Sequence, residues 1–284
     1  MEAGTKPLVR LRAMTADDLP AARELSREQN WPHRSADWAF LFDIGQGIVA
    51  ESDGAVVGTA MCWIYEGAAT IGMVIVSPAC QGQGIGRRMM NSLLETLGDR
   101  TVMLHATDEG LSLYKSLGFV PLGQVFQHQG AVFAVPIPEL QAGERVRPMG
   151  SRDVDAACDL DRQATGMQRD RVIATLCDVS QGVVLARADE PAGFALFRRF
   201  GRGYVIGPTI APDLDGAKAL ISHWLGSNAG MFCRLDVADD SGLSVWLDEL
   251  GLPCVGRVTR MVRGEPLAVT GPGQTYSLIN QALR

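Results

Sequence analysis

The chain has 284 residues, of which 46% are hydrophobic and 20% charged, so a disordered chain is excluded. Its 26 Lys and Arg against 32 Asp and Glu give a net charge of −6, which argues against a nucleic-acid partner. No apolar run approaches the roughly 18 residues that a membrane span needs, and the first six residues hold no apolar stretch of the signal-peptide kind. We therefore expect a cytoplasmic protein without a membrane partner, and we leave its oligomeric state open.

Apolar periodicity predicts strands and helices in turn along the chain. The first strand, at 9–13, leads into a helix that Thr15 caps, with acidic residues in its first turn. Further strands are expected as apolar runs between Gly and Asp turns, at 47–51, 55–65, 70–76 and 101–105. A helix at 85–97 has its apolar residues at helical spacing, and another at 111–117 precedes a final strand pair. This order predicts an α/β fold with a mixed sheet and helices packed on it, and not a regular βαβ alternation.

The second half of the chain repeats the first at a constant offset of 135 residues. The segment Arg12–Asp18 shares its Arg, Met and Asp positions with Arg147–Asp153. Further matches follow without a gap: Gln46–Val49 with Gln181–Val184, Gly58 with Gly193, and Ile71–Gly72 with Ile206–Gly207. A chain of this length commonly holds about two domains. We expect two copies of one fold, at 1–138 and 144–284, joined where prolines and a glycine interrupt the pattern.

The cysteines and histidines give no sign of a metal site. Six cysteines are spread along the chain without a Cys-x-x-Cys pair, and the four histidines do not stand at ligand spacing. We expect reduced, mostly buried thiols and no bound metal.

The sharpest local feature is a strand, a glycine loop and a helix within Val74-Ile-Val-Ser-Pro-Ala-Cys-Gln-Gly-Gln-Gly-Ile-Gly86. Gly82, Gly84 and Gly86 would let the backbone approach a ligand closely, with free N–H groups at the start of a helix. Such an arrangement binds phosphate groups, whereas a plain strand-to-helix turn would rarely need three alternating glycines. Dinucleotide and ATP binding are both disfavoured. Arg87 stands where a dinucleotide fingerprint has Gly, no acid follows on the next strand, and Gly-Lys-Ser/Thr is missing.

Two motifs, in this order, resemble those of the GNAT (GCN5-related N-acetyltransferase) family. Gln81-Gly-Gln-Gly-Ile-Gly86 is similar to that family's acetyl-CoA motif, Gln/Arg-x-x-Gly-x-Gly/Ala. Leu113-Tyr-Lys-Ser-Leu-Gly-Phe119 is similar to a second family element, Leu-Tyr-x-x-x-Gly-Phe, and one helix and one strand separate the two. The resemblance covers about residues 8–135 well and the second copy only as a fold. It implies two tandem GNAT-like domains.

The resemblance also implies that acetyl-CoA is held mainly by backbone groups. The pantetheine arm would lie along Val74, Ile75 and Val76 like an added strand, with its amides paired to the first and last of these residues. Asp108 stands where many members have an Asn that touches the cofactor, so this contact is in question. The pyrophosphate would lie after Gln81, on the amides of Gly82, Gln83, Gly84, Ile85, Gly86 and Arg87.

Tyr114, in the second motif, is the candidate general acid. When an amine attacks the thioester, CoA leaves as a thiolate that must be protonated or stabilised. A phenol with a pKa near 10 remains protonated at neutral pH and can donate that proton. The alternative is a tyrosine that only packs behind the second helix.

The general base and the acceptor pocket are less well defined. The attacking amine must lose a proton to a carboxylate, a histidine or a chain of waters. Glu66 lies just before the expected cofactor strand and His105 ends the next strand, so both could face the acyl group. His33 lies in a loop region where members of the family commonly line the acceptor pocket, and Trp31 could shape that pocket. An ordinary structural role is the alternative for each of these residues.

The second copy is expected to have lost the chemistry. The offset of 135 puts Ala217, Ala219 and Ile221 where the first copy has its three glycines. A shift of the offset to 132 aligns Trp246 with Tyr114, and an indole is not a practical proton donor to a thiolate. The resemblance is therefore to tandem GNAT proteins with a degenerate C-terminal half.

These observations predict an N-acetyltransferase that transfers the acetyl group of acetyl-CoA to a small-molecule amine by direct attack. The alternative is a non-catalytic module that binds an acyl-CoA or has a regulatory role. The acceptor is open among aminoglycosides, amino acids, polyamines and protein N-termini, because a fold does not determine a substrate. An acidic cluster in the second copy, at Asp236, Asp239 and Asp240, could hold a cationic amine or could form a solvated loop.

Overall fold

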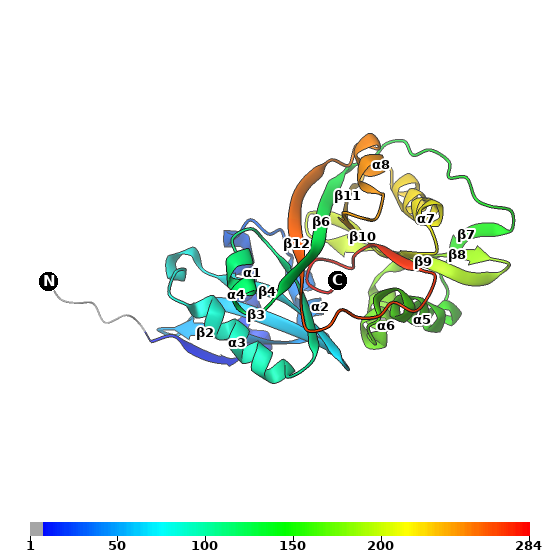
Figure 1. Ribbon diagram of the computed structural model, residues 1–284. Helices are drawn as coiled ribbons and strands as arrows, with labels where there is room; N and C mark the ends of the chain where they lie inside the picture. The colour runs from blue at the N-terminus through cyan, green and yellow to red at the C-terminus, as the bar shows by residue number, and fades with distance from the viewer. Residues whose placement is uncertain (1–7) are drawn as a thin grey trace.

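One mixed sheet runs through both copies. The computed structural model describes residues 8–284, so the residues of the signal-peptide argument lie outside the described range. Within that range the strands follow the order β1-β2-β3-β4-β5-β12-β6-β11-β10-β9-β8-β7, and β13 lies beside β10 (Figure 1). The α/β class expected from the sequence is confirmed.

The first copy contains the expected elements and one helix that the sequence did not indicate, α2. The expected final strand pair is a single long strand, β6, whose neighbours come from the second copy. The elements of the first copy are β1 (Arg10–Ala13), α1 (Leu19–Glu28), α2 (Ser35–Asp43), β2 (Gln46–Ser52), β3 (Ala55–Tyr65), β4 (Ala68–Val76), α3 (Ile85–Leu97), β5 (Thr101–Ala106), α4 (Leu111–Ser116) and β6 (Val120–Ala131).

The second copy repeats this order and adds one short strand at its end. Strands β8, β9 and β10 begin and end 135 residues after β2, β3 and β4, as the internal repeat predicts. The elements are β7 (Glu144–Pro148), α5 (Val154–Thr165), α6 (Asp170–Val179), β8 (Gln181–Arg187), β9 (Glu190–Phe200), β10 (Gly203–Ala211), α7 (Leu214–Ser227), β11 (Phe232–Ala238), α8 (Ser244–Glu249), β12 (Cys254–Arg263) and β13 (Gln274–Ser277).

The Arg and Asp residues that revealed the repeat form the same ion pair in both copies. Arg12 contacts Asp18 at 2.8 Å, and Arg147 contacts Asp153 at 2.7 Å. Each aspartate also accepts a hydrogen bond from a backbone N–H three residues before it. The ion pair thus fixes the entry into the first helix of each copy, which explains why Arg and Asp recur at this spacing.

The two copies exchange their last long strands. Strand β6 pairs antiparallel with β11 of the second copy, and β12 pairs antiparallel with β5 of the first. Strands β6 and β12 also pair with each other, so they lie side by side at the centre of the sheet (Figure 1). The boundary at 138–144 separates the copies in the sequence, but the sheet crosses it.

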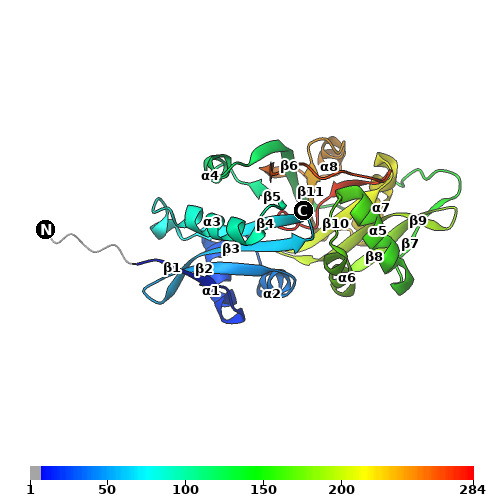
Figure 2. The same ribbon diagram turned by 60° about the horizontal axis from the view of Figure 1, so that its bottom comes forward.

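Helices cover both faces of the sheet. Helices α1, α2, α5 and α6 pack on a core shared by the two copies, which includes Trp38, Trp63 and Ile173. On the other face, α3 and α4 cover a core of the first copy, and α7 and α8 cover a core of the second. Figure 2 shows α1 and α2 on one side of the first copy's strands and α4 on the other. The shared core makes the interface between the copies part of the protein interior.

The described part of the chain has no helix long and apolar enough to cross a membrane. Nor do residues 8–284 hold a group of three His, Cys, Asp or Glu side chains arranged to bind a metal ion. The cysteines of this range are free thiols.

Candidate active site

Strands β4 and β5 separate in the middle of the first copy. They pair in parallel from Ala68 opposite Thr101 to Ile71 opposite Leu104, and β4 then continues to Val76 without β5. Met73 lies in this open part with a φ of 53°, at a bulge in the pairing of β4 with β3. The hydroxyl of Thr59 donates a hydrogen bond of 2.8 Å to the carbonyl of Met73 and holds the bulge in place. The open strand edge can accept an extended ligand as an added strand.

A groove of about 740 Å³ runs along this open edge. It brings together most of the residues singled out for the cofactor: Val74, Ile75, Val76, Gln81, Gly82, Gly84, Ile85, Gly86 and Arg87. Gln83 and Asp108 are exposed and are not among the residues that line the groove. Thr107 and Glu109, on either side of Asp108, line it instead.

The glycine loop presents the backbone of the α3 N-terminus to this groove. Gly82 and Gly84 have φ angles of 73° and 77°, a conformation that side chains rarely adopt, and a Cβ at either would have no described atom within 4 Å. Gly84 is the N-cap residue of α3, and no side chain caps that end. The first-turn N–H groups of a helix lack partners within the helix and carry its positive dipole end. The loop can therefore bind an anion through backbone groups.

Tyr114 lies on α4 and faces the groove. The residue is 8% exposed, and burial raises the pKa of its phenol to about 12. Its ring packs edge-on against Phe119, and its hydroxyl makes no hydrogen bond to any of residues 8–284. Its position agrees with a phenol that stays protonated and is free to donate to a ligand in the groove.

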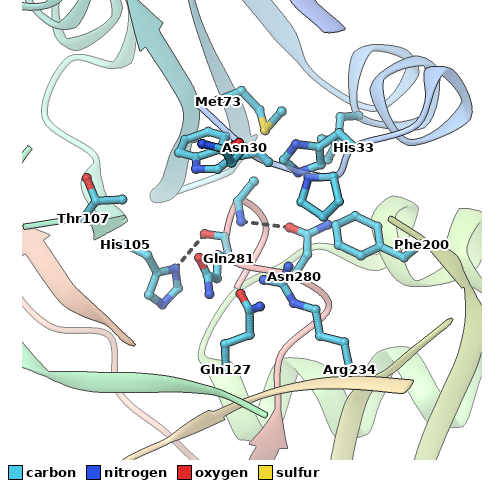
Figure 3. A pocket seen from close by; sticks show the side chains of 15 residues that line it. Asn30, His33, Met73, His105, Thr107, Gln127, Phe200, Arg234, Asn280 and Gln281 are labelled. Atoms are coloured by element: carbon cyan, nitrogen blue, oxygen red, sulfur yellow. Dashed lines mark hydrogen bonds between the residues drawn. The ribbon is translucent and has the colours of Figure 1, made fainter. Parts of the chain in front are cut away.

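A second, smaller pocket of about 180 Å³ meets the groove at the β4 bulge. The two share Trp31, Gly72, Met73, His105 and Thr107 among their lining residues. Trp31 and His33, both expected at an acceptor pocket, line the smaller one (Figure 3).

The far wall of this pocket comes from the second copy and from the last residues of the chain. Sequence reasoning missed these residues, because nothing in the local pattern shows that β6, β9, β11 and the C-terminal segment meet at this point. They are Gln127, Phe200, Arg234, Asn280, Gln281 and Ala282 (Figure 3).

The two histidines at the pocket are neutral at physiological pH. Burial, together with the charge of Arg234, lowers the pKa of His33 to about 4. Burial also lowers the pKa of His105 to about 4, although a hydrogen bond with the carbonyl of Gln281 opposes that shift. Glu66, the third candidate base, is exposed in the β3–β4 turn at the far end of β4 and lines neither pocket. The structure therefore removes Glu66 from the site.

Comparisons with known proteins agree with this geometry. Models described as acetyltransferase (GNAT) domain match residues 43–121 and 157–277, which together are more than half of the chain. The uncharacterized N-acetyltransferase YitH of Bacillus subtilis is 28% identical over 235 residues, which cover 81% of this chain and 82% of YitH. The chain belongs to the GNAT acetyltransferase family. It is an acyltransferase with two GNAT domains in tandem, the first and second copies described above.

Solved structures show the same fold over the whole chain. A structure from Pyrococcus horikoshii assigned as an acetyltransferase superposes with a TM-score of 0.79 at 21% identity, with 100% of each chain covered. A tandem GNAT protein from the clavulanic acid biosynthesis pathway superposes with a TM-score of 0.62 at 13% identity, over 93% of this chain and 100% of that one.

The cleft of the second GNAT domain is filled by the chain itself. Strand β10 pairs with β11 only at Tyr204 and Val205, and the two then separate as β4 and β5 do. Beyond the bulge, Thr209, Ile210 and Ala211 pair with β13. At the offset of 135 these three residues are the equivalents of Val74, Ile75 and Val76. A strand of the protein thus occupies in the second domain the edge that stays open in the first.

The glycine loop of the second GNAT domain is missing and not merely substituted. Residues 77–84 join β4 to α3, whereas only Pro212 and Asp213 join β10 to α7. The expected equivalents of the glycines, among them Ala217 and Ala219, are buried inside α7. The carboxylate of Asp213 caps α7 by accepting a hydrogen bond from the N–H of Gly216. This helix end has a negative charge where the first domain has open amides.

The equivalent of Tyr114 is Leu247, and the alignment with Trp246 was wrong. The backbone N–H of Tyr114 donates to the carbonyl of Gly110, and the carbonyl of Tyr114 accepts from the N–H of Phe119. The backbone of Leu247 makes the same two hydrogen bonds, to the carbonyl of Leu243 and from the N–H of Leu252. The two helices therefore align at an offset of 133 residues. The second GNAT domain therefore has an aliphatic side chain in place of the phenol.

Proposed function

We propose that the protein transfers the acetyl group of acetyl-CoA to an amine, and that the first GNAT domain alone holds acetyl-CoA. One observation carries this proposal: Thr209 to Ala211 pair with a strand of the protein, whereas the equivalent Val74 to Val76 line an open groove. An edge that is satisfied by β13 in one domain needs an external partner in the other. The pantetheine arm has amides that can pair in this way.

The remaining features of the groove fit the same ligand. The uncapped amides at the start of α3 suit the pyrophosphate, and the Gln81 side chain donates to the carbonyl of Val76, which ties the loop to the strand. Arg87 lines the groove with its guanidinium 2.8 Å from the Ser116 hydroxyl, where it adds a positive charge. Acetyl-CoA supplies an activated acetyl thioester when it is bound.

We assign the two proton transfers of the reaction to two side chains. Tyr114 is protonated at physiological pH, faces the groove and can donate its proton to the sulfur of the leaving thiolate. His105 lies where the groove meets the acceptor pocket, and its neutral ring can accept the proton that the amine loses. The amine would enter through the pocket of about 180 Å³, a volume that suits a small molecule.

The alternative, a binding module without catalysis, agrees less well with the site. A module that only binds acyl-CoA does not need an unpartnered phenol in the groove or a neutral histidine beside it. The second GNAT domain, where β13 pairs with the equivalent strand edge, has Leu247 in place of the phenol and lacks the glycine loop.

A thiol-release assay with acetyl-CoA and a panel of amines tests the proposal. We expect amine-dependent release of CoA thiol from the wild-type protein, with an acetylated product of the expected mass. Tyr114→Phe should reduce the rate, whereas Tyr65→Phe, which removes a buried hydroxyl hydrogen-bonded to Thr70, should not. Release that does not depend on any amine would overturn the transfer reaction.

A further inference from the structure

The lining of the acceptor pocket holds one cation, Arg234, whose partner Asp236 lies behind it and outside the lining. Arg234 is the one charged side chain among the described residues that line it, and no Asp or Glu does so. The acidic cluster that the sequence suggested for a cationic amine is used elsewhere. Asp239 and Asp240 both face Arg260 at 3.3 Å, and Asp236 is fully buried beneath Arg234. A ligand with several positive charges would find no carboxylate here.

The guanidinium of Arg234 is held in place through two of its three nitrogens. Its Nε and one Nη donate to the two carboxylate oxygens of Asp236, each at 2.9 Å. Its guanidinium lies 5.5 Å from the ring centre of Phe200, which fixes its plane. The remaining nitrogen, Nη1, donates to no atom of the described chain, and the side chain keeps 12% exposure at the pocket. An arginine oriented in this way offers its free N–H groups to an anion.

A buried arginine beside the pocket adds positive charge. Arg198 is 7% exposed and has no carboxylate within ion-pair distance among residues 8–284. It contacts the rings of Phe40 and Phe200 and donates to the carbonyl of Ile279, next to the pocket residue Asn280. A buried cation without a direct ion-pair partner is costly, and the more distant charge of Asp37 offsets only part of that cost. An anionic ligand in the pocket would reduce this cost.

Two buried polar atoms of the lining also lack partners. Nδ1 of His33 and Nδ2 of Asn280 make no hydrogen bond within the described chain. The amide of Asn280 is oriented by its own oxygen, which accepts from the N–H groups of Ala282 and Leu283 at 2.8 and 2.9 Å. Buried polar groups are normally paired, so unpaired atoms around one pocket point to a polar ligand.

We propose that the acceptor is a small amine with an apolar body and a carboxylate, such as a free apolar amino acid, and that Arg234 binds its carboxylate. This inference rests on the proposed acetyl transfer. Trp31, Leu41, Met73 and Phe200 provide apolar walls for the side chain of such an acceptor. Figure 3 shows Arg234 and Gln127 on the side of the pocket opposite His33 and Met73. Met73 lies at the junction with the groove. The proposal predicts that polyamines and aminoglycosides, which are polycations, are poor acceptors.

Matched ligands test the carboxylate without altering the protein. L-Leucine, L-leucinamide and 3-methylbutylamine share the amine and the aliphatic body but differ in the carboxylate. Binding is measured by calorimetry on the full chain saturated with CoA, and acetylation of each amine is followed by mass. A hydrogen-bonded ion pair predicts about tenfold to hundredfold tighter binding of L-leucine than of the other two. The same series with the methionine and phenylalanine analogues varies the size of the apolar side chain.

Variants then assign the effect to Arg234. Arg234→Gln should abolish the preference for L-leucine over L-leucinamide, and Arg234→Lys should weaken it. Because Arg234→Gln leaves the buried Asp236 without a positive partner, the double variant Arg234→Gln with Asp236→Asn removes both charges together. Arg199→Gln is the control, since Arg199 is an exposed arginine of β9 that stacks on Tyr204 and does not line the pocket. CoA binding and the melting temperature confirm that each variant is folded.

The outcomes separate the substrate class from the transfer reaction. Equal binding and acetylation of amino acid, amide and amine would overturn the carboxylate site while acetyl transfer stands. Tight, Arg234-dependent binding of L-leucine without acetylation of any amine would support the carboxylate site and overturn the transfer. Failure of all three apolar amino acids to bind would overturn the inference, whatever the amines show.

Discussion

The main-chain carbonyl of Gln281 accepts a hydrogen bond from Nδ1 of His105 across 2.7 Å. Because a carbonyl can only accept, Nδ1 must carry the proton of the neutral ring, which leaves Nε2 with a free lone pair. Gln281 is itself held by a hydrogen bond of 2.9 Å from its side-chain amide to Asp236 of the second GNAT domain. The end of the chain thus fixes the tautomer of a histidine in the first domain.

His105→Gln should lower kcat by about a hundredfold, because general base catalysis typically contributes 10²–10⁴. The Kd for acetyl-CoA should change by less than about threefold, because the ring accepts a proton and does not grip the cofactor. His223→Gln, on α7 and outside both pockets, is the control. Steady-state kinetics with separate kcat and KM values measure the effect, and an unchanged kcat would remove His105 from the reaction.

Tyr114→Phe should reduce kcat while acetyl-CoA binding persists, because the phenyl ring keeps the packing against Phe119 and loses only the proton donor. The pKa of about 12 means that the phenol stays protonated through the usual assay range. We therefore expect no alkaline loss of kcat from this group below about pH 10. A pH profile of kcat checks this, and a Tyr114-dependent fall between pH 8 and pH 9 would contradict it.

Gly84→Ala should weaken acetyl-CoA binding by about tenfold, because a Cβ at a φ of 77° strains the loop by about 1–2 kcal/mol and narrows the approach to the α3 amides. Gly54→Ala is a matched control, since Gly54 has the same φ and the same open surroundings but lies in the β2–β3 turn. Both variants should lose similar stability, and only Gly84→Ala should lose affinity. Calorimetric titration measures the affinity; equal effects of the two on binding would count against the loop.

The protein should lose stability as the pH falls from about 6.5 to about 4. His33 and His105 have folded-state pKa values of about 4, below the unfolded value near 6.5, so the unfolded state binds more protons in this window. Their contribution is complete above pH 6.5 and is lost as the pH falls toward 4. It amounts to at most about 3 kcal/mol for each ring. His33→Phe should make urea unfolding less pH-dependent between pH 7.5 and pH 5, and an unchanged dependence would contradict this.

Local signals predicted the elements of each copy but not how the copies join. The internal offset of 135 placed β8 to β10 correctly, because Arg–Asp entry pairs and apolar runs recur in the sequence. Helix α2 was missed. The exchange of β6 and β12 could not be predicted from the sequence. A strand has the same apolar pattern whether its neighbour in the sheet comes from its own copy or from the other. The offset also changes after β10, where the second domain lacks the loop.

The candidate site was predictable where backbone chemistry needs particular residues. Glycines at 82 and 84 are required by positive φ angles, and Tyr114 stands in a recognisable motif. The bulge at Met73 has no sequence signal, because no glycine marks its positive φ. A hydrogen bond from Thr59 to the Met73 carbonyl holds this conformation instead. Arg234 and Gln281 reach the pocket only through the tertiary fold. Glu66 was predicted at the site because it is close to β4 in the sequence. It precedes the start of β4, whereas the groove lies at the end of that strand.

The central claim is that one GNAT domain holds acetyl-CoA while the other is closed by β13. A calorimetric titration of the full chain with acetyl-CoA tests this claim most directly. The account predicts a stoichiometry of one acetyl-CoA for each chain. A stoichiometry of two, or no binding at all, would contradict it.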